Sequence, residues 1–130
     1  MSENFNLEII SPDQIILKTE AMQVTIPSFE GLMSILKDHI SLVTFLRPGF
    51  IEVKTEKDEK KFFVEDGTVE LSNNSLLILS STVKSLKQLS KNEIDKMIKE
   101  SDEKIKDEKI KDKERYVLSY KIEALKEIRQ

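Results

Sequence analysis

Short apolar runs alternate with turn residues along the chain as far as about Val83. Within the runs, apolar and polar positions alternate, as around Val24 and Ile26 or Ile51 and Val53, which is the period of a half-buried strand. Strands this short, at such regular spacing, predict an antiparallel β-sandwich of about ten short strands. The clearest runs are Asn4–Ile10, Gln14–Lys18, Met22–Ile26, Phe50–Thr55, Lys60–Glu65, Val69–Ser72 and Leu76–Ser80.

The pattern changes after Leu89, where the apolar spacing becomes helical. All three glycines and all three prolines lie at or before Gly67, so nothing in the later sequence interrupts a helix strongly. Ser90 and Glu93 have the spacing of a capping box, and Leu89 and Ile94 that of a hydrophobic staple. A helix should therefore begin at Ser90.

Two apolar stripes follow, and they would lie on opposite faces of one straight helix. A break between Lys106 and Glu114 would bring them together as a helical hairpin, beside a tandem DEKIK repeat whose alternating charges suit a solvated face. We expect a sandwich domain over residues 1–85 and a two-helix hairpin over 86–130. The stripes consist of Ile94, Met97, Ile98 and Ile105, and of Val117, Leu118, Ile122, Ala124, Leu125 and Ile128.

The segment Glu30–Gly49 is ambiguous. Leu32, Ile35, Leu36, His39 and Val43 recur at helical spacing, yet both flanks are typical of strands. Periodicity alone allows either a helix inserted into a sheet or two strands without the usual turn residues.

Composition argues against an enzyme and against a nucleic-acid-binding protein. The 130 residues carry a net charge of −3, with no cysteine and a single histidine, His39. That balance provides no basic field for nucleic acid, and the absence of cysteine removes disulfides and thiolate zinc sites. The three glycines are too far apart for a phosphate-binding loop, and no G-x-S-x-G motif accompanies His39. We expect no catalytic residue, no metal and no cofactor.

The first ten residues, MSENFNLEII, lack the basic and apolar segments of a signal peptide, and no later run has the length of a membrane span. We therefore expect an intracellular protein with no membrane-spanning segment of its own.

Three motifs in order resemble the epsilon subunit of bacterial F-type ATP synthases, which is equivalent to the mitochondrial delta subunit. Leu7–Pro12 matches the opening L-x-I-x-(S/T)-P pattern of that family. Ile26–Gly49 keeps the spacing of its central signature, (V/I)-P-x-x-E-G through L-P-G-H-A-P-L to L-x-P-G. Phe62–Leu71 matches F-(F/Y)-V-x-x-G-x-(V/L)-E-(V/L). The resemblance covers essentially the whole chain.

This resemblance implies an answer to the ambiguity. Leu32–Leu36 and Ser41–Leu46 should be strands joined by a tight bend at residues 37–39. The family usually has Pro-Gly before the histidine and Ala-Pro after it, whereas this chain has Lys37-Asp38 and Ile40-Ser41. Asp38 can still support a bend, because Asp tolerates left-handed backbone.

The resemblance also implies a function: a non-catalytic rotor subunit of the central stalk, linking the gamma subunit to the membrane c-ring during proton-driven ATP synthesis. The complex would hold it at the cytoplasmic face of the bacterial inner membrane as a peripheral protein. Glu30, Gly31 and Leu32 match the loop that faces the c-ring, and His39, Ser41 and Leu42 match a region against gamma. The family often has an acidic residue where Leu32 stands.

In this family the hairpin is regulatory: folded on the sandwich it permits turnover, and extended along gamma it blocks ATP hydrolysis. Basic residues of the last helix then meet an acidic loop of the catalytic beta subunits, and Lys121, Lys126 and Arg129 are the candidates here. Some members bind ATP through an (I/L)-D-x-x-R-A motif. This chain keeps Ile94 and Asp95 but has Ile98 in place of the arginine, so we expect no ATP binding at physiological concentration.

An alternative explains the composition and periodicity equally well. The chain could be a free-standing β-sandwich that binds a protein partner and associates with itself through its helical tail. It does not explain the three motifs in order. Co-purification with a large membrane complex would favour the first interpretation, and a stable isolated homodimer the second.

Overall fold

The computed structural model describes residues 3–129, and side chains as far as residue 128. Ten strands precede a short 3₁₀ helix, η1 (Leu86–Gln88), and two α-helices, α1 (Lys91–Ile105) and α2 (Asp112–Arg129). The strands are β1 (Phe5–Ile10), β2 (Ile15–Ala21), β3 (Gln23–Ser28), β4 (Gly31–Ile35), β5 (Leu42–Leu46), β6 (Gly49–Lys54), β7 (Glu59–Val64), β8 (Gly67–Ser72), β9 (Ser75–Leu79) and β10 (Lys84–Ser85).

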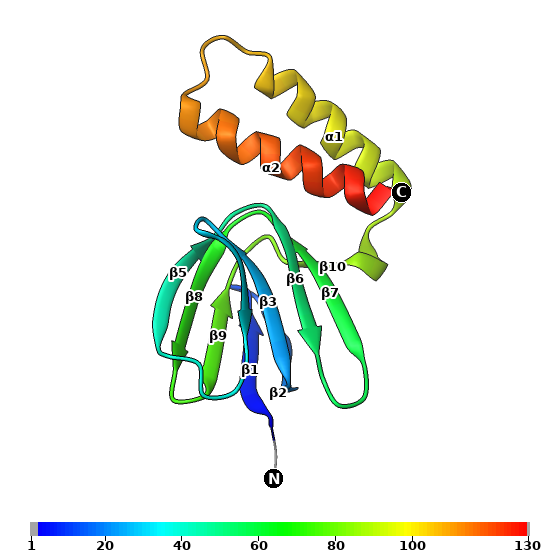
Figure 1. Cartoon of the computed structure of the whole chain (residues 1–130). Coiled ribbons are helices and arrows are strands. Elements are labelled where there is room, and N and C mark those ends of the chain that lie inside the picture. Colours follow the sequence, from blue (N-terminus) through cyan, green and yellow to red (C-terminus); the bar gives the residue numbers. More distant parts are fainter. Residues whose placement is uncertain (1–2, 130) are drawn as a thin grey trace.

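The strands form one curled sheet that folds over its own core (Figure 1). Their order is β10-β7-β6-β3-β5-β8-β9-β1-β2. The remaining strand, β4, pairs with β3, which therefore pairs with β4, β5 and β6. The sheet turns between β3 and β5, which share a single pair, Ser28 with Leu46. Every pairing is antiparallel except that of β1 with β9, which is parallel. The predicted sandwich is thus confirmed, with one parallel pair that the sequence pattern did not reveal.

Alternation along the strands builds this core. In β1, Phe5, Leu7 and Ile9 point inward while their neighbours are more exposed. Inward side chains of the other strands complete one apolar cluster, whose buried members all come from the sheet. Burying these side chains is the main force that stabilises the sandwich.

The ambiguous segment is two strands, as the family motif implied. β4 and β5 are joined by a bend in which Asp38 has a φ of 66°. Asn74, with a φ of 61°, lies opposite in the β8–β9 turn. Its amide oxygen accepts from the Asp38 backbone N–H at 2.7 Å, and its Nδ2 donates to the Asp38 carboxylate at 3.0 Å. These two bonds hold the bend without the usual glycine and prolines.

The hairpin folds back across one end of the sandwich (Figure 1). Its turn covers residues 106–111, inside the predicted interval. Arg115 holds the turn by donating to the backbone carbonyls of Ile105 and Asp107. A second apolar cluster joins both helices to the sandwich; its buried members are Phe63, Ile94, Ile98, Ala124 and Leu125.

The start of α1 is close to the prediction. Ser90 is the N-cap, and its Oγ accepts from the backbone N–H of Glu93 at 3.1 Å. Leu89 packs against the same cluster as Ile94, as the predicted staple requires. A complete capping box forms one element earlier, between Ser85 and Gln88 at η1. None of the helices described is long and apolar enough to cross a membrane.

Candidate functional site

Exposed apolar side chains gather in residues 29–45. Six of the nine large apolar residues that are exposed in the described chain lie there: Phe29, Leu32, Leu36, Ile40, Val43 and Phe45. Leu32 is 72% exposed, Val43 71% and Phe45 60%. A soluble protein seldom places so many apolar side chains together in water unless a partner covers them. We call this segment the apolar edge.

The apolar edge arises because β4 and β5 are apolar on both faces. Ile35 and Leu46 point into the core and are fully buried or nearly so, while Leu32 and Val43 point out. One face therefore stabilises the fold, and the other is available for contact.

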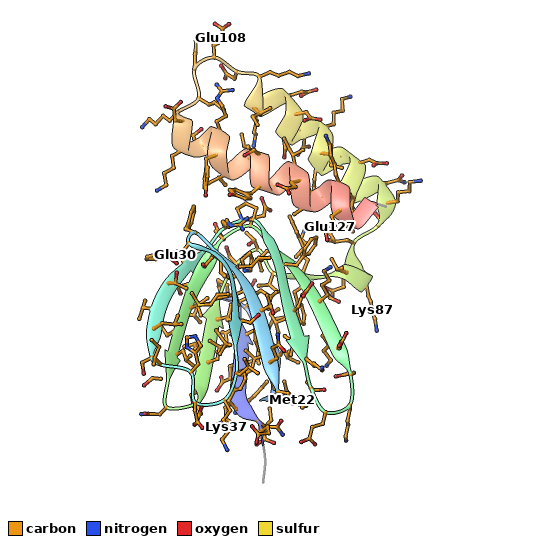
Figure 2. All side chains as sticks on the ribbon, viewed as in Figure 1. Met22, Glu30, Lys37, Lys87, Glu108 and Glu127 are labelled. Carbon is orange, nitrogen blue, oxygen red and sulfur yellow. The ribbon has the colours of Figure 1, made fainter. Side chains whose placement is uncertain are left out.

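The six predicted interface residues separate into two groups at opposite ends of the sandwich. Figure 2 labels Glu30 at the end beside the helices and Lys37 at the far end. Glu30, Gly31 and Leu32 lie in and just after the β3–β4 turn. His39, Ser41 and Leu42 lie in and just after the bend at the far end. The structure does not bring the two groups together.

The β3–β4 turn is firmly held. Gly31 has a φ of 122°, which favours glycine, and the Ser28 hydroxyl donates to its carbonyl at 2.6 Å. The hydroxyl of buried Thr44 donates to the Glu30 carboxylate at 2.8 Å. Glu30 is exposed but oriented, so it presents a fixed charge rather than a mobile one.

At the bend, the predicted residues differ in exposure. The His39 ring Nδ1 lies 2.7 Å from the Ile40 carbonyl oxygen, so Nδ1 carries the proton and donates locally. Ser41 is exposed, whereas Leu42 is half-buried against the main core. Among the residues described, no cluster of three or more His, Cys, Asp or Glu is placed to hold a metal ion.

Of the predicted basic residues, Lys121 has a partner on the sandwich. Its Nζ lies 2.6 Å from the Glu65 carboxylate, with only 19% of the lysine side chain exposed. Lys126 is exposed. Arg129 is the last residue of α2, and its side chain lies outside the described part of the chain. In the docked hairpin Lys121 is thus paired within the chain, and the predicted contacts of these three residues with the beta subunits stay a prediction.

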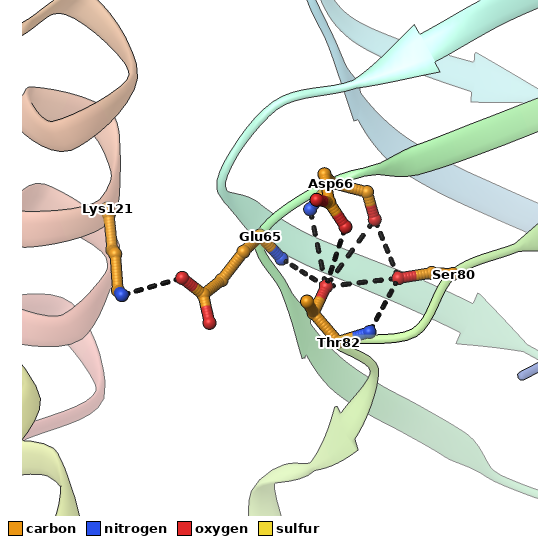
Figure 3. Close-up of polar contacts among 5 residues, drawn as sticks. All are labelled: Glu65, Asp66, Ser80, Thr82 and Lys121. Carbon is orange, nitrogen blue, oxygen red and sulfur yellow. Dashed lines mark hydrogen bonds and ion pairs between the residues drawn. The ribbon is translucent and has the colours of Figure 1, made fainter. Parts of the chain in front are cut away.

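A polar network positions Glu65 for this ion pair (Figure 3). The Thr82 hydroxyl oxygen accepts from the backbone N–H groups of Glu65 and Asp66, at 2.9 and 3.3 Å. The Ser80 hydroxyl donates to the Asp66 carbonyl at 2.6 Å. The turn that carries Glu65 is therefore held by contacts that lie within the sandwich.

A second contact between hairpin and sandwich was not anticipated from the sequence. Phe29 stacks on Tyr116 with ring centroids 6.4 Å apart, and Tyr116 meets Tyr120 edge-on at 4.8 Å. The Arg47 guanidinium lies 3.9 Å from the centre of the Tyr120 ring. We call Phe29, Arg47, Tyr116 and Tyr120 the aromatic cluster. The available signal was a pair of tyrosines four residues apart, outside the apolar stripe of α2.

Within this cluster the two phenols are hydrogen-bonded. The Tyr116 hydroxyl donates to the Tyr120 oxygen at 3.3 Å, which raises the pKa of the Tyr116 phenol above its ordinary value of 10.0. Desolvation adds to the rise and the Arg47 charge opposes it. The phenol is therefore protonated, and remains a donor, throughout the physiological pH range.

An open hollow of about 1070 Å³ separates the start of α2 from the sandwich. Phe29 and Phe45 line it from the apolar edge, Ser81 from the end of the sandwich and Lys113 from α2. The hairpin therefore does not seal this end of the sandwich completely.

Comparison with known proteins identifies the class and then the family. Residues 4–85 match the family model described as the beta-sandwich domain of the ATP synthase delta/epsilon chain. The ATP synthase epsilon chain of Pelagibacter ubique is 40% identical over 129 residues, which is 98% of this chain and 99% of the relative. The ATP synthase epsilon chain of Parvibaculum lavamentivorans is 32% identical over 130 residues, which is 99% of this chain and 98% of the relative.

Solved structures agree in fold. A chain of the Euglena gracilis mitochondrial ATP synthase assembly of OSCP, F1 and c-ring has a TM-score of 0.80, covering 98% of this chain and 82% of that one at 20% identity. A chain of the Tetrahymena thermophila mitochondrial ATP synthase central stalk and c-ring has a TM-score of 0.64. The match covers 96% of each chain at 10% sequence identity.

The fold and these relatives define a non-catalytic stalk subunit of the ATP synthase complex. The chain belongs to the ATP synthase delta/epsilon chain family. This confirms the resemblance drawn from the three motifs, and it decides against the free-standing module. The chain is associated with the membrane through that complex.

Proposed function

We propose that this chain is the rotor subunit that joins the gamma subunit to the membrane c-ring, at the cytoplasmic face of the bacterial inner membrane. The apolar edge carries the proposal, because it is an exposed apolar surface built on paired strands of the sheet. A standard protein interface buries about 800 Å² on each partner. Exposed side chains spread along residues 29–45 suit a partner that lies along this edge.

We assign the gamma subunit to the bend end of the apolar edge. His39, Ser41 and Leu42 lie in the same loop and strand start as Leu36 and Ile40, which are 53% and 80% exposed. Contact there would remove both apolar side chains from water, which favours binding. His39 contributes shape at this surface, since its Nδ1 is already bonded locally.

We assign the c-ring to the β3–β4 turn. Glu30 is held by Thr44 and Gly31 shapes the turn, so the turn offers a fixed carboxylate beside exposed Leu32. Polar loops of a ring can meet this carboxylate, and Leu32 adds an apolar contact where the family often has an acid.

Substitutions on the apolar edge test the gamma assignment. Val43→Asp places a charge on an outward position of β5, so the fold should survive while binding to gamma is lost. Ile15→Asp is the matched control, because Ile15 is 59% exposed but lies outside the apolar edge. Co-purification of both variants with tagged gamma gives the result. Equal recovery of the two variants would contradict the assignment.

We further propose that the hairpin regulates ATP hydrolysis. Docked as here, it holds Lys121 against Glu65, and this state permits turnover. Extended along gamma, it would free Lys121 to join Lys126 and Arg129 against an acidic loop of the beta subunits. Since the buried members of the main core all come from the sheet, the sandwich does not need the hairpin to fold.

Reconstitution of the ATPase head with the full-length chain and with a chain ending at Leu86 tests this regulation. Hydrolysis should rise when the hairpin is absent. Equal rates in the two preparations would show that the hairpin is only structural.

ATP binding to the hairpin is not expected. Ile98, at the position of the motif arginine, is buried in the cluster that joins the helices to the sandwich. An arginine at this position could reach a phosphate only if the cluster were opened. Calorimetric titration should give no sub-millimolar binding constant, and such a constant would refute the expectation.

A further inference from the structure

The aromatic cluster forms a closed circuit that begins and ends at the β3–β4 turn. Phe29, in the turn, stacks on Tyr116, which contacts Tyr120. Tyr120 lies under the Arg47 guanidinium, and Arg47 Nε donates at 2.9 Å to the carbonyl of Ser28, the residue before Phe29. Tyr116 and Tyr120 of α2 thus connect Phe29, in the turn, to Arg47, which is hydrogen-bonded to the residue before Phe29.

The backbone of the turn depends on the same residues. The Phe29 N–H donates to the Phe45 carbonyl at 3.2 Å, and the Arg47 N–H donates to the Pro27 carbonyl at 2.9 Å. These bonds join the turn to β5 and to the residues after it. Side-chain contacts that restrain Phe29 and Arg47 therefore also restrain the hydrogen bonds that define the turn.

The hairpin leaves Phe29 and Tyr116 partly open to water, at 39% and 43% exposure. Such contacts are weaker than buried ones, and they can break and re-form without unfolding the sandwich. A structural core would be sealed, whereas a reversible contact between two moving parts need not be.

We propose that the aromatic cluster couples docking of the hairpin to the conformation of the β3–β4 turn, so that a partner that captures the turn also favours the docked hairpin. The partner is the membrane c-ring, so this part of the inference rests on the proposed function. Coupling between two sites is reciprocal: if docking orders the turn, ordering the turn favours docking by the same factor.

The first experiment asks whether the hairpin orders the turn, using the isolated full-length chain. Because the chain has no cysteine, Ser81→Cys and Lys113→Cys provide a unique pair across the hollow. A bis-maleimide bridge between them holds the hairpin docked. Amide exchange of Phe29 and Arg47 is then compared among bridged proteins that differ only at position 116.

With the hairpin bridged, Tyr116→Leu should speed exchange of these two amides about fivefold, the effect of losing one exposed aromatic pair. Tyr116→Phe keeps the stack on Phe29 and should behave as the parent. The Ser80 amide, which donates to Ile10 on another strand, should not change in either variant. Parent-like exchange in bridged Tyr116→Leu would overturn the proposal.

The second experiment tests the reverse direction without a bridge. Phe29→Leu changes a residue of the turn and removes its stack on Tyr116, and it should speed amide exchange of Leu125, in the hairpin core, by about the same factor of five. Ile15→Ala is the matched control, because Ile15 is exposed and is not a member of the aromatic cluster. If Phe29→Leu leaves Leu125 exchange unchanged, the turn and the hairpin are independent.

The third experiment uses the assembled complex. Ring contact should slow Leu125 exchange in the parent but not in Tyr116→Leu. If both isolated-chain results hold and the complex shows no slowing in the parent, the coupling within the chain stands and the ring assignment of the turn is wrong. If the isolated-chain results fail, the coupling is wrong and the ring assignment is unaffected.

Discussion

The sandwich and the hairpin are held together by different means. The sandwich surrounds an apolar core. Its paired strands join distant parts of the chain, as where Asn6 of β1 lies opposite Ser75 of β9. The hairpin shares a smaller cluster with Phe63, one ion pair and the aromatic cluster. The first is stabilised mainly by area removed from water, and the second adds specific polar contacts that are individually weak. We therefore expect undocking of the hairpin to cost less free energy than unfolding of the sandwich.

The strongest test of this contrast is a cavity in the sandwich core. Leu7→Ala removes a fully buried side chain from β1 and should lower the free energy of unfolding by about 3 kcal/mol. Urea denaturation followed by circular dichroism measures the loss. Asn6→Ala, on the exposed face of the same strand, is the control and should lie close to the parent. Similar losses from both would mean that β1 is not packed as described.

A cavity in the hairpin should have a more local effect. Leu125→Ala should weaken docking by about 2 to 3 kcal/mol, because Leu125 is fully buried between the helices and the sandwich. The helical signal should then melt before the sandwich, whose own transition should barely move. Lys126→Ala, on the exposed side of α2, controls for helix propensity. A single shared transition lowered by the full amount would show that the two parts unfold as one.

The smallest effect is expected from the ion pair. Lys121→Met keeps the apolar stem and removes the charge, and it should weaken docking by about 0.5 to 1 kcal/mol, since the pair is only partly buried. Docking of the parent should weaken in high salt, and docking of the variant should not. Glu65→Gln and the double variant complete a cycle that isolates the pair. Equal salt dependence in parent and variant would assign no role to this contact.

Alternation and turn residues were sufficient to predict most strands, because short apolar runs such as β1 and β8 are bounded by turn residues and show the strand period. The same two signals did not predict β4 and β5, because both strands carry apolar side chains on both faces. Leu32 and Val43 face solvent while Ile35 and Leu46 face the core, so the alternation that reveals a strand is erased. Only the family motif separated the two strands. The helix-like spacing therefore came from apolar side chains on the exposed face of these strands as well as the buried one.

The contacts between the two parts were harder to predict. The apolar stripes of the helices indicated that they pack, and the break at residues 106–111 followed from their rotation. The aromatic cluster could not be foreseen, because Phe29, Arg47 and Tyr120 meet only after the sheet has curled and the hairpin has docked. Lys121 was predicted only as a contact to the beta subunits, which stays a prediction; its ion pair with Glu65 in the docked hairpin was not foreseen.

The parallel pairing of β1 with β9 has a consequence for how the molecule is made. Asn6 leaves the ribosome early, but its neighbour Ser75 is added only after seven further strands have been synthesised. Contacts so distant in sequence form slowly, because a long loop must close first. Until β9 emerges, β1 can pair only with β2, so the sheet is completed late in translation. The helices are synthesised last, after every strand of the surface on which they dock.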